Sequence, residues 1–263
     1  MIEVNNIIKS FEGQEVLHNI SARFETGQNN LIIGQSGSGK TVLMKCLIGL
    51  VKPERGQILY DGRDLLAMGR REIKKLREEI GMLFQGSALF DSMTVEENVM
   101  FPLTMFSDKS LKERRKRAMF CLERVGLNGA ENKYPSEISG GMQKRVAIAR
   151  AISLNPRYLF CDEPNSGLDP QTSILIDELI NDITKEYGIT TIVNTHDMNS
   201  VLGIGDNIIF LNKGNKEWVG SKEEILTSKN KALNNFVFAS PLFKSVKNAA
   251  VSEEIIKDFP KEE

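Results

Sequence analysis

The chain has 263 residues, of which 41% are hydrophobic, and this is enough to fill the core of one large domain or of a domain with an inserted subdomain. Its 34 basic and 35 acidic residues leave a formal net charge of −1, which excludes the global field of a typical nucleic-acid or polybasic membrane-surface protein. Because it has no run of about 18 apolar residues and no signal-peptide pattern in residues 1–11, we expect a cytoplasmic chain whose membrane-spanning partners are separate polypeptides.

The N-terminal third is expected to form a mostly antiparallel β lobe. Short strands are predicted over residues 2–9, 21–24 and 57–60, and the last of these is closed by the turn pair Asp61-Gly62. Within this lobe the apolar run 30–33 leads into a glycine-rich stretch, and residues 41–50 then show helical spacing. Strand, glycine loop and helix is the order that a phosphate site requires.

The glycine-rich stretch matches the phosphate-loop pattern G-x-x-x-x-G-K-[ST]. Its glycines allow successive backbone N–H groups to close on phosphate oxygens at a helix N-terminus, where the helix dipole also favours anions. We expect Lys40 to reach the β- and γ-phosphates of ATP and Thr41 to ligate Mg²⁺. The candidate nucleotide-binding residues of this loop are Gly34, Gln35, Ser36, Gly37, Ser38, Gly39, Lys40 and Thr41.

Residues 87–155 are rich in helical patterns and predict an inserted helical subdomain. The clearest helix begins at Ser110, with Glu113 three residues later as a capping box, and ends near Gly126. Its expected buried face consists of the apolar residues Leu111, Ala118, Met119, Leu122 and Val125.

The remainder of the chain alternates between strand and helix patterns. The apolar runs 158–161 and 190–194 flank a helical pattern over residues 170–187, and this order predicts a parallel sheet. Residues 207–211 and 216–219 predict a terminal hairpin around Gly214. The expected fold class is therefore α/β: a P-loop NTPase with a mainly parallel sheet core, an N-terminal antiparallel β lobe and an inserted helical subdomain.

Two carboxylates, Asp162 and Glu163, follow the first of these strands, at the end where parallel sheets bind ligands. Asp162 is suited to hold Mg²⁺ through its water shell. Glu163 is suited to polarise the water that attacks the γ-phosphate, while Lys40 and the metal stabilise the transferring group. Acidic pairs after a strand also begin helices and turns, so this pattern alone leaves catalysis and capping equally open.

Further short motifs stand in a fixed order around these acids. They are SGG at residues 139–141 ahead of a helical pattern over 144–152, DEP at 162–164, SGLD at 166–169 and THD at 195–197. Together with the phosphate loop they resemble the ATP-binding cassette family over about residues 2–225. The resemblance implies an ATPase that converts ATP and water to ADP and phosphate, coupled to transmembrane transport, with ATP and Mg²⁺ as cofactors.

The SGG motif is a second anion site at a helix N-terminus, but one chain cannot apply both sites to one γ-phosphate from opposite sides. In the family, the motif of one subunit closes over the nucleotide of the other, so the resemblance implies a head-to-tail homodimer with two ATP molecules. By this resemblance Ser139, Gly140 and Gly141 bind nucleotide.

The resemblance also assigns three single residues. Phe11 would stack on adenine, Gln85 would contact Mg²⁺ and water, and His196 would sense the γ-phosphate. Phe11 could instead be a core residue and Gln85 a turn residue. The resulting catalytic set is Glu163, His196, Gln85 and Lys40, and the resulting metal set is Thr41, Gln85 and Asp162.

Residues 81–103 and 135–142 are similar to one branch, the ATPase of the maintenance-of-lipid-asymmetry (Mla) system and its mammalian-cell-entry relatives. That similarity implies phospholipid transport between bacterial membranes and integral-membrane permease subunits on separate chains. It also implies a mammalian-cell-entry-type substrate-binding protein and a peripheral place on the cytoplasmic face of the inner membrane. The alternatives are the ATPase of an amino-acid importer or lipoprotein exporter, or a soluble non-transport cassette. We expect no nucleic-acid partner, because no coiled coil or basic extension interrupts the cassette.

Three features leave questions open. Apolar residues after Gln85 could fill the helical subdomain or receive a helix of the membrane subunit; they are Leu89, Phe90, Met93, Met100 and Phe101. Residues 1–225 are expected to form the ATPase domain. Residues 226–263 would form an extension that packs on the cassette or the dimer partner and has a disordered end. Asn165 stands where most family members carry threonine or alanine, and the sequence suggests no role for it.

Overall fold

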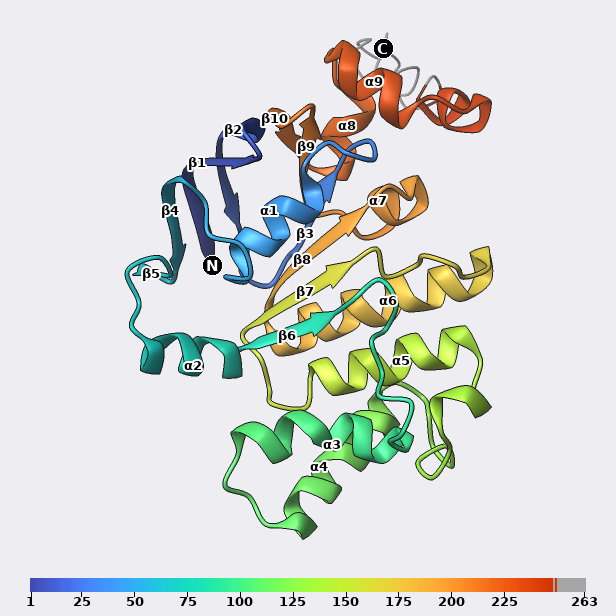
Figure 1. The fold of residues 1–263 in the computed structure, drawn as a ribbon. Coiled ribbons are helices and arrows are strands. Elements are labelled where there is room, and N and C mark those ends of the chain that lie inside the picture. Colours follow the sequence, from blue (N-terminus) through green and yellow to red (C-terminus); the bar gives the residue numbers. More distant parts are fainter. Residues whose placement is uncertain (248, 250–263) are drawn as a thin grey trace, which may run out of the picture.

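A six-stranded sheet forms the centre of the computed structural model, which describes residues 1–247 and 249 (Figure 1). The strand order is β10–β9–β3–β8–β7–β6. Five strands run parallel: β3 (Asn29–Ile33), β6 (Ile80–Leu83), β7 (Tyr158–Asp162), β8 (Thr190–Thr195) and β9 (Asn207–Asn212). The edge strand β10 (Asn215–Gly220) pairs antiparallel with β9. The expected mainly parallel core and terminal hairpin are thus confirmed.

Both faces of the parallel sheet are buried, which explains why its strands show no alternation of apolar and polar residues. In β7, the side chains of Tyr158 and Phe160 enter the core beneath the β lobe, together with helix α1 (Lys40–Leu47). Leu159 and Cys161 enter the opposite core, together with helices α6 (Pro170–Tyr187) and α7 (Met198–Ile204). Each central strand therefore joins two hydrophobic cores.

The N-terminal lobe is a four-stranded antiparallel sheet with the order β2–β1–β4–β5. Its strands are β1 (Ile2–Phe11), β2 (Gln14–Phe24), β4 (Arg55–Tyr60) and β5 (Arg63–Asp64). The sequence predicted only the last part of β2. Register shifts between β1 and β2 break the simple alternation of buried and exposed residues, so the first part of β2 carries no period-two signal.

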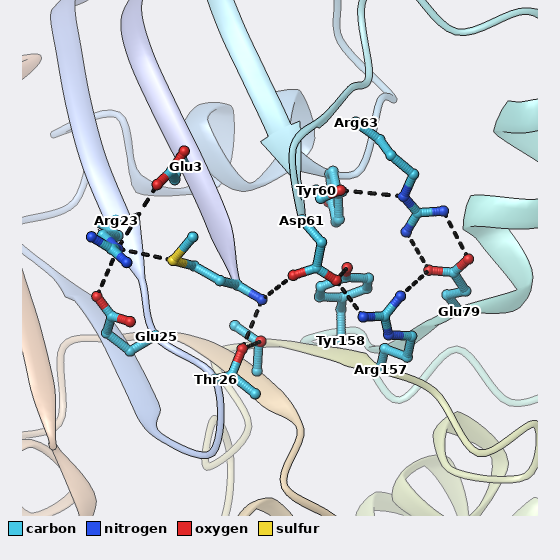
Figure 2. Close-up of polar contacts among 12 residues, drawn as sticks. Glu3, Arg23, Glu25, Thr26, Tyr60, Asp61, Arg63, Glu79, Arg157 and Tyr158 are labelled. Carbon is cyan, nitrogen blue, oxygen red and sulfur yellow. Dashed lines mark hydrogen bonds and ion pairs between the residues drawn. The ribbon is translucent and has the colours of Figure 1, made fainter.

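A carboxylate in the turn after β4 joins the lobe to the parallel sheet (Figure 2). Asp61 accepts hydrogen bonds from the Met1 ammonium group at 2.7 Å and the Tyr158 hydroxyl at 2.6 Å, and it also pairs with Arg157. Burial by itself would raise the pKa of Asp61, but these hydrogen bonds and charges hold that pKa below its usual value. Because Tyr158 is the first residue of β7, Asp61 fixes the lobe to the N-terminal edge of the central sheet.

Helices α3 (Val95–Phe106), α4 (Leu111–Arg124) and α5 (Gly140–Ala151) pack together at one end of the molecule, beyond the connecting helix α2 (Arg70–Glu78) (Figure 1). A short 3₁₀ turn, Pro135–Glu137, precedes α5. The expected capping box of α4 is present, since the Glu113 amide donates to the Ser110 hydroxyl.

The expected buried face of α4 was wrong at one residue. Ala118 and Leu122 are fully buried, but Leu111 is 63% exposed. Leu111 lies two turns before Ala118 on the same stripe, so the helical periodicity holds. Its exposure shows that no neighbouring element covers the first turn of the helix, which periodicity alone does not reveal.

The C-terminal helices α8 (Lys222–Thr227) and α9 (Lys231–Val237) lie at the other end of the molecule (Figure 1). Leu233, Val237 and Phe238 join the core, and the Phe236 ring stacks on Phe210 of β9 with centroids 5.5 Å apart. The expected disordered end of the chain lies outside the described residues. Within the residues described, no helix combines the length and apolarity needed to cross a bilayer.

Candidate functional site

Four loops converge at one edge of the sheet because each follows a parallel strand. The phosphate loop follows β3, Gln85 follows β6, Glu163 follows β7 and His196 follows β8. These loops line a cavity of about 690 Å³, which is large enough for a nucleotide's phosphates. The cavity is lined by Val16, Gln35, Ser36, Gly37, Ser38, Gly39, Lys40, Thr41, Val42, Gln85, Glu163, His196 and Phe236.

The phosphate loop depends on glycine at two places. Gly34 and Gly39 have φ angles of 151° and 103°, which side chains rarely allow. A Cβ atom at Gly34 would lie 2.2 Å from the backbone oxygen of Leu211, and one at Gly39 would lie 2.8 Å from the Leu17 side chain. The Ser38 hydroxyl is buried without a protein partner, so the loop offers a free donor that fits a phosphate oxygen.

Lys40 is buried at the base of this loop. Its ammonium group donates to the backbone oxygens of Gly34 at 2.7 Å and of Gln35 at 3.2 Å. Burial lowers the pKa of Lys40, while the carboxylates of Glu163 and Asp162 oppose that effect. The charge of Lys40 is therefore coupled to those of two carboxylates near the cavity, an arrangement suited to charge that develops on phosphate.

The two acidic residues are held by neighbouring segments. The Asp162 carboxylate accepts a hydrogen bond from the Asn194 amide at 3.0 Å. Glu163 has a left-handed backbone with φ of 48°, and one of its carboxylate oxygens lies 2.8 Å from His196 Nδ1. The structure thus brings Glu163 and His196 into direct contact.

Two buried cations of α5 hold the loop that begins at Gln85. Lys144 donates to the backbone oxygen of Gln85, and Arg150 donates to the backbone oxygens of Ser87 and Ala88, each at 2.7 Å. Burial lowers the pKa values of both Lys144 and Arg150. Sequence reasoning missed both residues. The available signal was a lysine and an arginine on the otherwise apolar buried face of α5.

The SGG segment lies elsewhere on the chain. Ser139 caps α5 by accepting a hydrogen bond from the Met142 amide at 3.3 Å. Ser139, Gly140 and Gly141 line a separate cavity of about 520 Å³, shared with Asp169. Within one chain, the phosphate loop and the SGG segment therefore do not meet in one cavity.

The remaining candidates differ in their placement. Phe11 ends β1, is 45% exposed and does not line the phosphate cavity; its ring lies under the Lys9 ammonium group at 4.9 Å. Val16 and Phe236 line that cavity and were not anticipated, because they reach it only through the hairpin of the β lobe and through α9.

The oxygen donors fit a magnesium ion that is bound together with phosphate. In residues 1–247 and 249, no cluster of three or more His, Cys, Asp or Glu side chains is suited to hold a metal. Magnesium in nucleotide sites usually takes only one or two protein oxygens and completes its shell with water and phosphate. That requirement is matched by Thr41 and Gln85 at the cavity wall and by Asp162, whose charge acts on Lys40.

The structure gives Asn165 an anchoring role. Its buried side chain donates to the Asp177 carboxylate at 2.9 Å and to the Ser200 hydroxyl at 3.0 Å. These bonds attach the loop after Glu163 to helices α6 and α7. Burial raises the pKa of Asp177 to about 6, although hydrogen bonds from Ser200 and Asn165 act in the opposite direction.

Comparison with known sequences yields one family and two groups of relatives. A family profile described as "ABC transporter" matches residues 17–166. The probable ribonucleotide transport ATP-binding protein mkl of Mycobacterium tuberculosis H37Rv is 39% identical over 236 residues. That match covers 90% of this chain but only 66% of the mycobacterial protein. The methionine import ATP-binding protein MetN of Clostridioides difficile is 38% identical over 237 residues, covering 90% of this chain and 74% of MetN.

Solved structures give the same result for the fold. A dimeric post-hydrolysis state of the ATP-binding cassette MJ0796, bound to ADP and Pi, aligns with a TM-score of 0.77 and 34% identity. It covers 84% of this chain and 99% of that one. CbiO1 from Clostridium perfringens, part of the ABC transporter complex cbiONQ, aligns with a TM-score of 0.80 and 31% identity, covering 94% and 97% of the two chains.

The buried Asp177 should make stability depend on pH. Its pKa is about 6 in the folded chain, compared with 3.8 for an ordinary aspartate in an unfolded chain, so the folded state retains a proton that the unfolded state releases. The free energy of unfolding should therefore rise as pH falls from about 7 toward 4, by up to about 3 kcal/mol from this residue, and this gain is lost above pH 6.

Asp177→Asn should remove that part of the pH dependence. Urea unfolding of the variant and the unsubstituted protein at pH 8 and pH 5 measures it. Glu178→Gln, an exposed neighbour on α6, is the control and should leave the difference between the two pH values intact. An equal pH dependence in Asp177→Asn and the unsubstituted chain would contradict the prediction.

Proposed function

This chain belongs to the ABC transporter family, and we propose that it is the ATP-hydrolysing subunit of a transporter whose membrane-spanning subunits are separate chains. One observation carries the proposal: the phosphate loop, Gln85, Glu163 and His196 line a single cavity. These groups supply phosphate binding, a general base and a residue that contacts the base, which together are the requirements of phosphoryl transfer to water.

Each residue has a chemical role in this proposal. The loop amides, Ser38 and Lys40 bind the phosphates, and Lys40 offsets the negative charge of the transferring group. Magnesium, held by Thr41, Gln85 and Asp162, would supply further charge neutralisation. Glu163 accepts the proton of the attacking water, and its contact with His196 at 2.8 Å fixes the direction of the carboxylate.

The separate position of Ser139, Gly140 and Gly141 supports a dimer. These residues present a helix N-terminus that is exposed to solvent, next to Asp169. A second copy related by two-fold symmetry can apply this segment to the nucleotide on the first copy's phosphate loop, and the same contact then occurs twice. ATP binding would close such a dimer, and hydrolysis would allow it to open.

The helical subdomain offers a docking surface for a permease helix. The Phe90 and Phe101 rings contact each other with centroids 4.6 Å apart, and Phe90 is 39% exposed. Leu89 and Met100 instead pack against the core. We therefore assign Leu89 and Met100 to the core of the chain. We assign the exposed Phe90 and its half-buried neighbour Phe101 to contact with the membrane subunit, which would place this chain on the cytoplasmic face of the inner membrane.

For the cargo we propose phospholipid, with a mammalian-cell-entry-type protein in the complex. This rests on the similarity of residues 81–103 and 135–142 to the Mla branch. The names of the relatives suggest other cargoes, since one group is named for ribonucleotide transport and the other for methionine import. Methionine import is the second candidate because MetN proteins match most of this chain.

Glu163→Gln should separate binding from hydrolysis. The amide keeps the shape of the side chain but cannot accept the proton, so ATP hydrolysis should fall by about 100-fold or more. ATP affinity should remain, and ATP-bound dimers should accumulate in size-exclusion chromatography. Glu178→Gln should hydrolyse ATP normally. If Glu163→Gln hydrolyses ATP at the normal rate, Glu163 is not the base.

A mixture of Lys40→Ala and Ser139→Ala chains tests the shared site. Each variant alone should be inactive, because all of its dimers have two damaged sites. In a mixed dimer, one site carries both substitutions and the other carries neither. If the two sites act independently, an equal mixture should regain about a quarter of the normal rate. No recovery, with mixed dimers demonstrated by differential tags, would count against a site built from two chains.

Co-purification tests the cargo. The complex is extracted from native membranes in mild detergent through a tag on this chain, and its proteins and lipids are identified by mass spectrometry. We expect a permease, a mammalian-cell-entry-type protein and bound phospholipid. A permease accompanied by a protein that binds methionine, and ATPase activity stimulated by methionine, would replace the phospholipid proposal with the import alternative.

A further inference from the structure

We propose that Asn194 is a positioning residue whose side chain orients the metal-binding carboxylate of Asp162. The proposal rests on the function proposed above, in which Asp162 helps to hold magnesium. Asn194 carries no assigned role in the motifs that define the site, because it lies inside β8, just before Thr195 and His196.

The sheet register places Asn194 beside the acidic residues. Strands β7 and β8 are parallel neighbours, and Asp162 pairs with Asn194 in their register. Asn194 has no solvent exposure and follows the apolar Ile192 and Val193. A buried amide is unfavourable unless its polar groups find partners, so its contacts indicate why it is there.

Asn194 contacts both acidic residues. Its side-chain Nδ2 donates to Asp162 Oδ1 at 3.0 Å, and its backbone oxygen accepts the Glu163 amide at 3.0 Å. The first bond holds one oxygen of Asp162 and leaves the other for the metal. The second holds Glu163 in its left-handed backbone conformation, with φ of 48°. The side chain of Asn194 therefore fixes the metal-binding carboxylate, while the bond to Glu163 is a backbone bond of the sheet that any residue at this position could form.

The amide also reaches the helix that follows the phosphate loop. Asn194 Nδ2 lies 3.5 Å from the sulfur of Met44 on α1. Only Nδ2 can face Asp162, because an ionised carboxylate accepts but does not donate. The amide orientation is therefore set by the charge of Asp162.

The cost of this arrangement favours a functional role. Asn194 Oδ1 is buried and has no hydrogen-bond partner. A buried unpaired oxygen destabilises the fold, and an apolar residue of similar size would avoid that penalty. An apolar residue could not donate a hydrogen bond to Asp162. We therefore infer that the amide is present for the site and not for the stability of the sheet.

The test compares nucleotide affinity with and without magnesium. Asn194→Leu removes the donor and the unpaired oxygen while keeping the branched shape of the side chain. Binding of a fluorescent, non-hydrolysable ATP analogue is measured with Mg²⁺ in excess and with EDTA. The gain in affinity from Mg²⁺ should fall about tenfold in Asn194→Leu, as for other residues that orient metal ligands. Affinity in EDTA should stay within about twofold, and the midpoint of thermal unfolding should not decrease.

Three further variants separate the possible causes. Val193→Ala is a structural control: it should lower the unfolding midpoint by removing buried methyl groups but keep the gain from Mg²⁺. Asn194→Ser, a smaller residue whose hydroxyl cannot reach as far as the amide, should show the same reduced gain if Asn194→Leu fails to fold. Asp162→Asn should abolish the gain from Mg²⁺.

The outcomes distinguish the two proposals. If Asp162→Asn keeps the gain from Mg²⁺, the metal role of Asp162 fails and the proposed function loses that part. If Asp162→Asn loses the gain but Asn194→Leu and Asn194→Ser keep it, the role of Asn194 alone is wrong. An equal loss of affinity with and without Mg²⁺ in the Asn194 variants would also overturn the proposal, because it would indicate a general disturbance of the cavity.

Discussion

The hydrogen-bonded alignment of four parallel strands determines where the chemistry of this chain can occur. Because β3, β8, β7 and β6 are successive neighbours that point the same way, the loops after them must emerge side by side. The alignment is stabilised because both faces of these strands are buried and each strand contributes apolar side chains to two cores. The polar groups of the cavity are thus positioned by the ends of four strands that are held rigidly in the sheet.

Local signals in the sequence predicted much of the fold. The phosphate loop, the helix Pro170–Tyr187 and the capping box of α4 depend on residues near one another in the chain, and each could be read directly. The start of β2 and the exposure of Leu111 depend on pairing and on covering elements, so periodicity gave the wrong answer there.

The candidate site was predictable to a similar degree. The motif residues of the four loops line one cavity, although Asp162 and Phe11 are not among the residues that line it. The residues that hold these loops carried no motif. These residues are Lys144, Arg150, Asn194 and the Asn165–Asp177 pair, which act through contacts between separate segments of the chain. For Lys144 and Arg150 the sequence offered only their place on the apolar buried face of α5, and the contacts themselves appear only in the folded structure. These buried polar groups lie around the loops of the site. Their desolvation is unfavourable for stability, but their hydrogen bonds hold the loops in the geometry that the site requires.

The position of helix α5 would connect the two nucleotide sites of a dimer. Its first turn carries the SGG segment. Farther along the helix, Lys144 and Arg150 donate hydrogen bonds to the backbone oxygens of Gln85, Ser87 and Ala88. In a two-fold dimer, the first turn of α5 would contact one ATP molecule, and the loop that begins at Gln85 would contact the other. Each α5 would then connect the two nucleotide sites rigidly, and because the dimer contains two copies of this helix, the sites would be connected twice. Binding of ATP at one site would then affect the groups that contact ATP at the other site, while the secondary structure between the two sites stays the same.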